Sequence, residues 1–171
     1  MKIYFGSDHA GFELKNKLVV FVRDELGYKV EDCGAHEFNP DDDYPDFIAP
    51  VAERVSTEPE TTRGIVLGGS GQGEAMVANK FRGVRAVVYY GEPCAAAMSK
   101  KSISPEHSII TLSRTHNDAN VLALGARFLD EATTLEAVKA WLETPFGGEE
   151  RHTRRLLKMS MIGTENTPTA K

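Results

Sequence analysis

RGIVLGGSGQGEAMVANK, at residues 63–80, is the stretch that decides the fold. Its apolar run at about 64–68 predicts a short buried strand, and the glycines that follow predict a tight turn. The residues from about 74 to 81 are expected to form a helix. A strand that leads through a tight turn into a helix is half of a βαβ unit, from which parallel sheets are built. This stretch therefore predicts an α/β domain.

The same alternation of short apolar runs and helix-period segments continues along the chain. The other predicted strands lie at about 2–6, 29–33, 85–90 and 121–124, and the other predicted helices at about 12–26, 46–56, 93–101 and 131–143. A basic run at 151–155 leads into a short amphipathic arm. We expect one α/β domain over residues 1–144, an arm over 145–163 and a disordered tail over 164–171.

The composition excludes several classes of function. The chain has 171 residues, a formal net charge of -5 and a pI near 5.6, so no overall positive field attracts nucleic acid or an anionic membrane. An anionic substrate must then be bound by local positive groups. No window approaches the roughly 18 apolar residues of a membrane span, and the N-terminus lacks the apolar core of a signal peptide, so a cytoplasmic location is expected. Cys33 and Cys94 are expected to be reduced thiols.

The glycine loop at 68–73 either binds an anion or only makes a turn. It lacks the lysine and the following Ser or Thr of a P-loop, and it has no GxGxxG spacing for a dinucleotide. What remains is a backbone nest that can hold a small anion or oxyanion, or a purely structural turn. Glu74 directly follows the loop, where it is either a partner of the helix dipole or a positioned general base. The sequence leaves both questions open.

Three segments are expected at the carboxyl ends of the strands, where ligands of open parallel sheets bind. These are residues 6–11, 68–74 and 116–118. His9 and His116, in the first and last of them, are either ordinary turn histidines or parts of the site.

The other candidate groups are charged or metal-binding side chains. The histidines form neither an HExxH motif nor a Cys/His cluster, so no metal is predicted. Arg151 and Arg155 are four residues apart and share a helix face. They are either a solvated surface or a phosphate site, for which guanidinium groups are well suited.

Six segments spread over almost the whole chain follow the order of one family. They are GSDHAG at 6–11, DYPD at 43–46, RGIVLGGSGQGEAMVANK at 63–80, GVRA at 83–86, THNDANVLALGAR at 115–127 and RHTRR at 151–155. Together they resemble the ribose-5-phosphate isomerase B family. The resemblance implies a three-layer Rossmann-like (flavodoxin-like) sandwich with a mostly parallel five-stranded sheet, and no metal or cofactor. It also implies a homodimer or dimer of dimers, with active sites at the subunit interface and the arm packed on a partner.

The resemblance also implies roles for individual residues. Those implied to be catalytic are Glu74, His116, Ser70 and Asp8, and those implied to bind substrate are His9, Tyr44, Gly69, Gly71, Gly73, Asn117, Arg127, Arg151 and Arg155. Many family members carry a cysteine base where this chain has Gly68. A second branch has glycine there and a glutamate after the loop. Gly68 and Glu74 are similar to that glutamate branch, so Glu74 is the expected base.

The implied reaction is the interconversion of ribose 5-phosphate and ribulose 5-phosphate through an enediolate, a step of the pentose phosphate pathway. The stretch at 98–113 is longer than the family's usual connection, and this leaves the preferred sugar open. The alternatives are an isomerase of allose, galactose or tetrose phosphate, and a non-catalytic protein that binds a sugar phosphate.

Overall fold

The computed structural model describes residues 1–92 and 108–162. Within these ranges, five strands form one sheet in which every adjacent pair is parallel. They are β1 (Lys2–Ser7), β2 (Lys29–Asp32), β3 (Thr62–Gly68), β4 (Ala86–Tyr89) and β5 (Val121–Gly125), in the order β2-β1-β3-β5-β4. Each strand lies where the sequence predicts one, so the α/β class and the five-stranded sheet are confirmed. In the flavodoxin order, 2-1-3-4-5, the last two strands have the opposite places.

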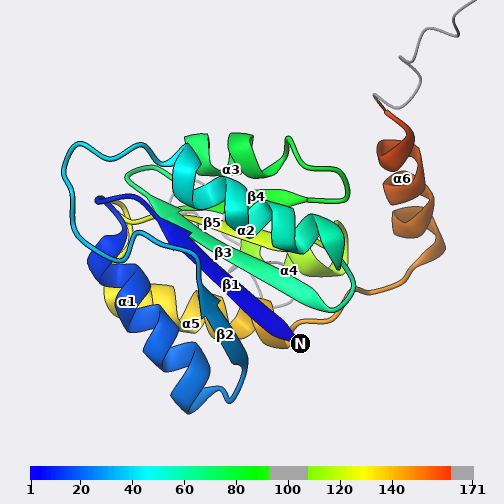
Figure 1. Ribbon diagram of the computed structural model, residues 1–171. Helices are drawn as coiled ribbons and strands as arrows, with labels where there is room; N and C mark the ends of the chain where they lie inside the picture. Colours follow the sequence, from blue (N-terminus) through cyan, green and yellow to red (C-terminus); the bar gives the residue numbers. More distant parts are fainter. Residues whose placement is uncertain (93–107, 163–171) are drawn as a thin grey trace, which may run out of the picture.

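Helices cover both faces of the sheet, which gives the expected three layers (Figure 1). One face carries α1 (Phe12–Val20), its π-helical continuation η1 (Phe21–Glu25), and α5 (Glu131–Glu143). The other face carries α2 (Pro45–Thr57) and α3 (Gln72–Ala78).

One helix, α4 (Ile109–Thr115), was not predicted. It begins after Ser108, whose hydroxyl accepts a hydrogen bond from the amide of Thr111 and so caps the helix. It lies in the stretch at 98–113 that the sequence left without a clear element. The rest of that stretch and the helix predicted at 93–101 fall outside the described residues, as does the predicted tail at 164–171.

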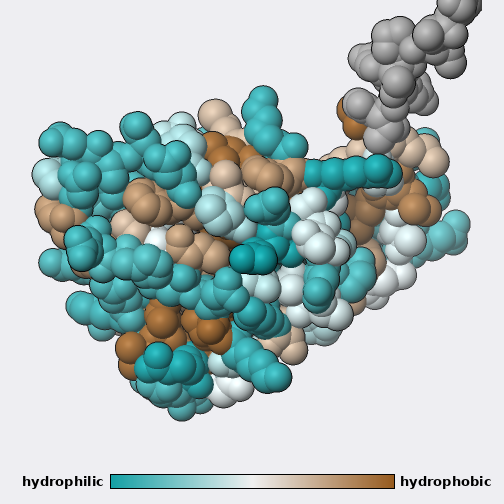
Figure 2. Space-filling view, in the orientation of Figure 1, coloured by the Kyte–Doolittle hydropathy of each residue, from teal (hydrophilic) through white to brown (hydrophobic). Residues whose placement is uncertain are grey.

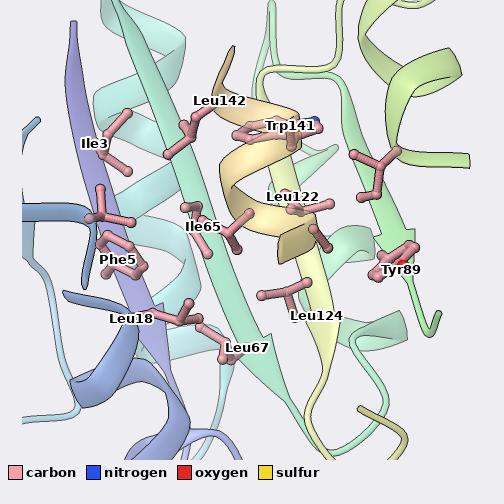
Figure 3. Packing of buried hydrophobic residues seen from close by; sticks show 14 of the residues in the cluster. Ile3, Phe5, Leu18, Ile65, Leu67, Tyr89, Leu122, Leu124, Trp141 and Leu142 are labelled. Carbon is pink, nitrogen blue, oxygen red and sulfur yellow. The ribbon is translucent and has the colours of Figure 1, made fainter. Parts of the chain in front are cut away.

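The core consists of two clusters, one on each face of the sheet. Successive side chains of a strand point to opposite faces, so Ile3 and Phe5 pack towards α1 and α5 while Tyr4 packs towards α2. Figure 3 shows the first cluster, in which Trp141 of α5 is fully buried. Because both faces of a parallel sheet are covered, its central strands can carry apolar side chains on both faces. The sequence therefore has continuous apolar runs at 64–68 and 121–124.

Because all strands of the sheet are parallel, their carboxyl ends lie together at one side and their amino ends at the other. We call these sides the carboxyl edge and the amino edge. Gly68 at the end of β3 is paired with Gly125 at the end of β5, and Ser7 at the end of β1 is paired with Leu67. The segments that follow these strands therefore emerge together at the carboxyl edge. The segment that precedes Val121, the first residue of β5, lies at the opposite, amino edge.

A last helix, α6 (Glu150–Met161), stands away from the rest of the chain (Figure 1). Its apolar side chains are largely exposed: Leu157 by 59%, Met161 by 63% and the following Ile162 by 80%. They gather on α6 in the space-filling view (Figure 2). No helix among residues 1–92 and 108–162 is both long enough and apolar enough to cross a membrane.

Candidate active site

Asp8 lies where β1 ends and α1 begins, and its carboxylate is nearly buried. One carboxylate oxygen accepts hydrogen bonds from the amides of Ala10 (2.9 Å) and Gly11 (3.3 Å). Gly11 sits so close to β3 that a Cβ there would be 2.5 Å from the Cβ of Leu67. The glycine thus lets α1 start directly against the sheet, and the turn holds Asp8 at the carboxyl edge.

The glycine loop after β3 is shaped by its contacts with two other site residues. Gly71 has a φ of 74°, in the left-handed region that glycine adopts without strain. A Cβ on Gly69 would lie 3.2 Å from the guanidinium carbon of Arg127, and a Cβ on Gly73 would lie 2.7 Å from the ring of Tyr44. The loop glycines therefore bring Arg127 and Tyr44 against the backbone of the loop. Within the loop, the hydroxyl of Ser70 accepts a hydrogen bond from the amide of Gln72 at 3.3 Å.

Glu74, in the first turn of α3, points its side chain into the site. It is only 4% exposed. An ideal Cβ on Gly68 would lie 1.7 Å from Oε1 of Glu74 and 2.2 Å from its Cδ. The carboxylate therefore fills the space that any side chain at position 68 would need. A glutamate that only complemented a helix dipole would be expected in solvent.

Burial raises the pKa of Glu74, and the nearby charge of Asp8 raises it further, whereas a hydrogen bond from the residue's own amide lowers it. Desolvation is the largest of these effects. A carboxylate with a raised pKa is a stronger base than an exposed glutamate, as proton abstraction from carbon requires.

His9 is bound to a residue that the sequence analysis missed. Its Nδ1 lies 2.7 Å from Oδ1 of Asp42, and its amide donates to the same oxygen at 3.1 Å. The potential ligand atoms of Asp8, His9 and Asp42 lie within 4.8 Å of one another, so among the described residues this is the grouping that could hold a metal ion. The contact between His9 and Asp42 is, however, a direct hydrogen bond. The acidic run at 41–43, just before Tyr44, is the signal in the sequence that could have pointed to Asp42.

His116 and Asn117 lie at the amino edge, and the expectation that they follow a strand end at the carboxyl edge is wrong. They follow α4 and precede β5, so the chain has already returned to the other end of the sheet. The turn was grouped with the strand ends although it comes after the helix predicted at 93–101 and directly before the strand predicted at 121–124. β3 has seven residues, so the two edges are about 20 Å apart.

The turn after α4 is fixed by a network of arginines. Asp118 adopts a φ of 44° and accepts from Arg85 (2.6 Å) and from Arg114 (2.9 Å), whose side chain is buried. Arg114 also donates to the carbonyls of Ala119 and Thr144. These bonds connect the turn to β4 and to the end of α5. They hold the backbone from which His116 and Asn117 project.

The arm contacts His116 through the ring of His152. The rings of His116 and His152 stack with centroids 4.1 Å apart and planes inclined by 14°. His152 is buried, and this burial lowers its pKa, as do the neighbouring His116 and Arg151. Arg151 and Arg155 are exposed on the same helix, and Arg151 pairs with Glu149 at 2.8 Å.

The predicted site residues thus fall into two sets in one chain. The first, which we call the carboxyl-edge group, consists of Asp8, His9, Tyr44, Gly69, Ser70, Gly71, Gly73, Glu74 and Arg127. The second, the amino-edge group, consists of His116, Asn117, Arg151 and Arg155. The distance between the edges prevents one chain from bringing both sets to one small ligand.

The thiol of Cys33 lacks the lowered pKa of a catalytic cysteine. Cys33 follows β2, is half-buried and packs against the core on the α2 side. Burial raises the pKa of the Cys33 thiol to about 11, so it is protonated at neutral pH. Cys94 lies outside the described residues.

Comparison with known families decides what kind of site this is. Residues 3–159 match the family model described as Ribose/Galactose Isomerase. The chain belongs to this family. It is a sugar-phosphate isomerase of the ribose-5-phosphate isomerase B family. The family predicted from the sequence motifs is confirmed.

Several relatives cover nearly the full chain. Ribose-5-phosphate isomerase B of Mycolicibacterium paratuberculosis is 40% identical over 156 residues, which is 91% of this chain and 87% of the relative. The Bacillus subtilis protein YwlF, named only for an unspecified sugar phosphate, is 36% identical over 97% of this chain and 99% of its own length. Among solved structures, ribose-5-phosphate isomerase B of Mycoplasma genitalium with bound ribulose-5-phosphate has a TM-score of 0.80 at 33% identity, covering 96% of this chain and 97% of that one.

Proposed function

We propose that the protein interconverts ribose 5-phosphate and ribulose 5-phosphate, with Glu74 as the base. The observation that carries this proposal is the buried Glu74 carboxylate in the space above Gly68, beside the glycine loop and near Asp8. The relatives named for ribose 5-phosphate support the choice of sugar. The YwlF relative leaves a second candidate, an isomerase of another sugar phosphate such as allose, galactose or tetrose phosphate.

The complete site would combine the carboxyl-edge group of one chain with the amino-edge group of a second chain. Two features favour this dimer. A cleft of about 820 Å³, lined in part by Val84, Asn117, Leu156 and Met159, separates α6 from the body. The apolar side chains of α6 also face solvent in the isolated chain. A second copy that packs on the arm would bury this surface, either in a dimer or in a dimer of dimers.

Binding would begin at the phosphate group of the substrate. His9 and Arg127 would approach it from one chain, and Arg151 and Arg155 from the other. Guanidinium groups form paired, charge-assisted hydrogen bonds with phosphate, which suits an acidic protein that lacks a general positive field. Because the phosphate does not react, these contacts provide binding energy that positions the rest of the sugar.

Ring opening would follow. His116 of the second chain would move a proton from the anomeric hydroxyl to the ring oxygen, while Asp8 orients the sugar. Tyr44 and Asn117 would hold the open chain in place. The products of this step are a C1 aldehyde and a free hydroxyl, with no net change in protons.

Glu74 would then remove the proton from C2 of the open aldose and return it to C1. A second proton moves from the C2 oxygen to the C1 oxygen, so that the ketose forms without an oxidant or reductant. The developing negative charge on the enediolate oxygen would be stabilised by Ser70 and by the amides of the loop that contains Gly69, Gly71 and Gly73.

An isotope-exchange assay with Glu74→Gln tests this function. The substitution keeps the size of the side chain and removes the base, so we expect kcat for ribose 5-phosphate to fall by ~10² to 10⁴ with little change in KM. Exchange of the C2 hydrogen with deuterated water should disappear. In the unmodified protein, kcat should rise with pH through the raised pKa of Glu74, above the ordinary range of a glutamate.

The control for that assay is Glu143→Gln, which changes an exposed glutamate at the end of α5. The same assay is run with allose, galactose and tetrose phosphates. Faster turnover of one of these would change the substrate but keep the mechanism. Near-normal turnover and exchange by Glu74→Gln would refute Glu74 as the base, and no turnover of any sugar phosphate would refute the isomerase itself.

A further inference from the structure

Asp42 is a buried carboxylate on the loop between β2 and α2 that the proposed reaction does not use. Its side chain is only 5% exposed. A single oxygen, Oδ1, accepts both the amide of His9 (3.1 Å) and the Nδ1 of the same residue (2.7 Å). The second oxygen, Oδ2, is buried without a hydrogen-bond partner among the described residues. The hydrogen bonds that Asp42 accepts from His9 therefore fix both the backbone and the ring of His9.

This contact determines which ring nitrogen of His9 a ligand can use. An ionised carboxylate only accepts hydrogen bonds, so the Nδ1 of His9 must carry a proton. Nε2 is then the nitrogen available to a ligand. A phosphate oxygen accepts hydrogen bonds, and it is bound best by a ring that carries protons on both nitrogens. The negative charge of Asp42 compensates the positive charge of such a ring.

The loop that carries Asp42 is held at both ends, as a positioning role requires. At its start, the fully buried Lys15 donates to Asp32 (2.5 Å) and to the carbonyl of Ala35 (2.8 Å). At its end, the ring of Tyr44 packs on Gly73 of the glycine loop. Asp42 thus occupies a fixed place relative to the site.

An aromatic side chain restricts His9 further. The ring of Phe38 stands edge-on to that of His9, with centroids 6.4 Å apart, and edge-on to that of Phe12 at 6.2 Å. The ring of His9 is therefore held by a hydrogen bond at one nitrogen, and it also contacts the ring of Phe38, which is itself largely exposed. A side chain restrained in this way loses less conformational entropy when it binds a ligand.

We propose that Asp42 is a positioning residue that holds the ring of His9 so that Nε2 donates a hydrogen bond to the phosphate group of the substrate. This inference rests on the proposed function, in which His9 binds that phosphate. Asp42 does not touch the substrate itself. Its contribution is expected in binding, because the phosphate end of the sugar takes no part in the proton transfers.

The test compares Asp42→Ala with Asp41→Ala. Both remove one carboxylate from the same loop, but Asp41 is exposed, and its amide rather than its carboxylate makes the local contact with Asn39. Loss of one charge-assisted hydrogen bond should raise KM for ribose 5-phosphate, and Ki for inorganic phosphate, by roughly tenfold in Asp42→Ala. Its kcat should stay within about threefold of the unmodified protein, and Asp41→Ala should change neither constant by more than about twofold.

Nitrogen NMR of His9 provides a readout that does not depend on activity. With inorganic phosphate bound, both ring nitrogens of His9 should carry protons in the unmodified protein, and in Asp42→Ala the Nδ1 signal should shift because its acceptor is lost. The His9 signals are assigned by their loss in His9→Gln. In that background, Asp42→Ala should add little to KM, because two residues that act through one contact are not additive.

Unchanged His9 signals in Asp42→Ala, or KM and Ki values equal to those of Asp41→Ala, would overturn the inference. If Asp42→Ala does not fold, Asp42→Asn is tested in its place. Because this variant loses only the charge, we expect KM and Ki to rise by about threefold. If the protein turns over no sugar phosphate, the proposed function fails. The His9 signals and the binding of inorganic phosphate still decide the role of Asp42 in that case.

Discussion

The carboxyl-edge group and the amino-edge group are supported in different ways. Asp8 and Glu74 are buried, and backbone amides and the close approach of glycines hold them in place. Arg151 and Arg155 are exposed on α6, and the ring of His152 connects this helix to the turn that carries His116. One group is therefore complete within the body of a single chain. The other lies partly on a helix that stands away from the body of the chain.

This difference separates the chemistry from the delivery of the substrate. In the proposed mechanism, the base and the oxyanion loop need a dry, fixed environment, and the buried carboxylate of Glu74 lies in such an environment. In the proposed mechanism, the residue that opens the ring and two of the arginines that bind the phosphate lie where assembly with a second chain can bring them in. Substitution of Glu74 should then act on proton transfer, and substitutions in the amino-edge group on ring opening and binding.

The largest effect is expected from Gly68→Ala, which targets the carboxyl-edge group. The new Cβ would occupy the position of the Glu74 carboxylate, so the base must move, and kcat should fall by ~10² or more. In the Glu74→Gln background the same alanine should cost little more, because the base is already absent. Steady-state kinetics of the single and double variants measure this. Full additivity of the two effects would show that Gly68 acts independently of Glu74.

The next effect, in the amino-edge group, is expected from His116→Gln. Loss of the residue that opens the ring should slow conversion of ribose 5-phosphate by about 10². Ribulose 5-phosphate carries its phosphate on the C5 oxygen and cannot close a furanose ring. Exchange of its C1 hydrogen with deuterated water should therefore continue at near the normal rate. Equal loss of turnover and exchange would place His116 in the proton transfer at carbon instead.

A smaller effect, on stability, is expected from Asp118→Ala. Removing this carboxylate leaves the buried Arg114 without its ion-pair partner, so the free energy of unfolding should fall by about 2 to 4 kcal/mol in urea titration. The matched control is Asp24→Ala, which breaks the exposed pair with Arg23 and should change the free energy of unfolding far less. Equal losses for the two variants would contradict the role given to the arginine network.

The sequence predicted the carboxyl-edge group better than the amino-edge group, for a physical reason. Continuous apolar runs identify buried strands, and a glycine loop after such a run must lie at a strand's carboxyl end, so Gly68 and Glu74 could be placed correctly relative to each other. The edge on which His116 lies depends on which strand the turn adjoins. The sequence predicts a helix at 93–101 and a strand at 121–124, so the turn should have been assigned to the start of that strand, at the amino edge.

For two further contacts, no local pattern in the sequence identified the partner residue. Asp42 lies 33 residues from His9 and looked like one of several acidic residues in a loop. The stacking of His116 on His152 joins a turn to a helix that packs on little else in its own chain. Such contacts depend on tertiary structure, which periodicity and motif spacing do not encode.

Mixing two inactive variants tests most directly whether the two groups meet across a dimer. Glu74→Gln disables the carboxyl-edge group and His116→Gln the amino-edge group, so a mixed dimer would contain one intact site and one doubly altered site. After dissociation and random reassociation, half of the dimers should be mixed, and about a quarter of the normal turnover of ribose 5-phosphate should return. Each variant taken alone through the same treatment should remain inactive. If the mixture also stays inactive although mixed dimers form, both groups act within one chain and the account is contradicted.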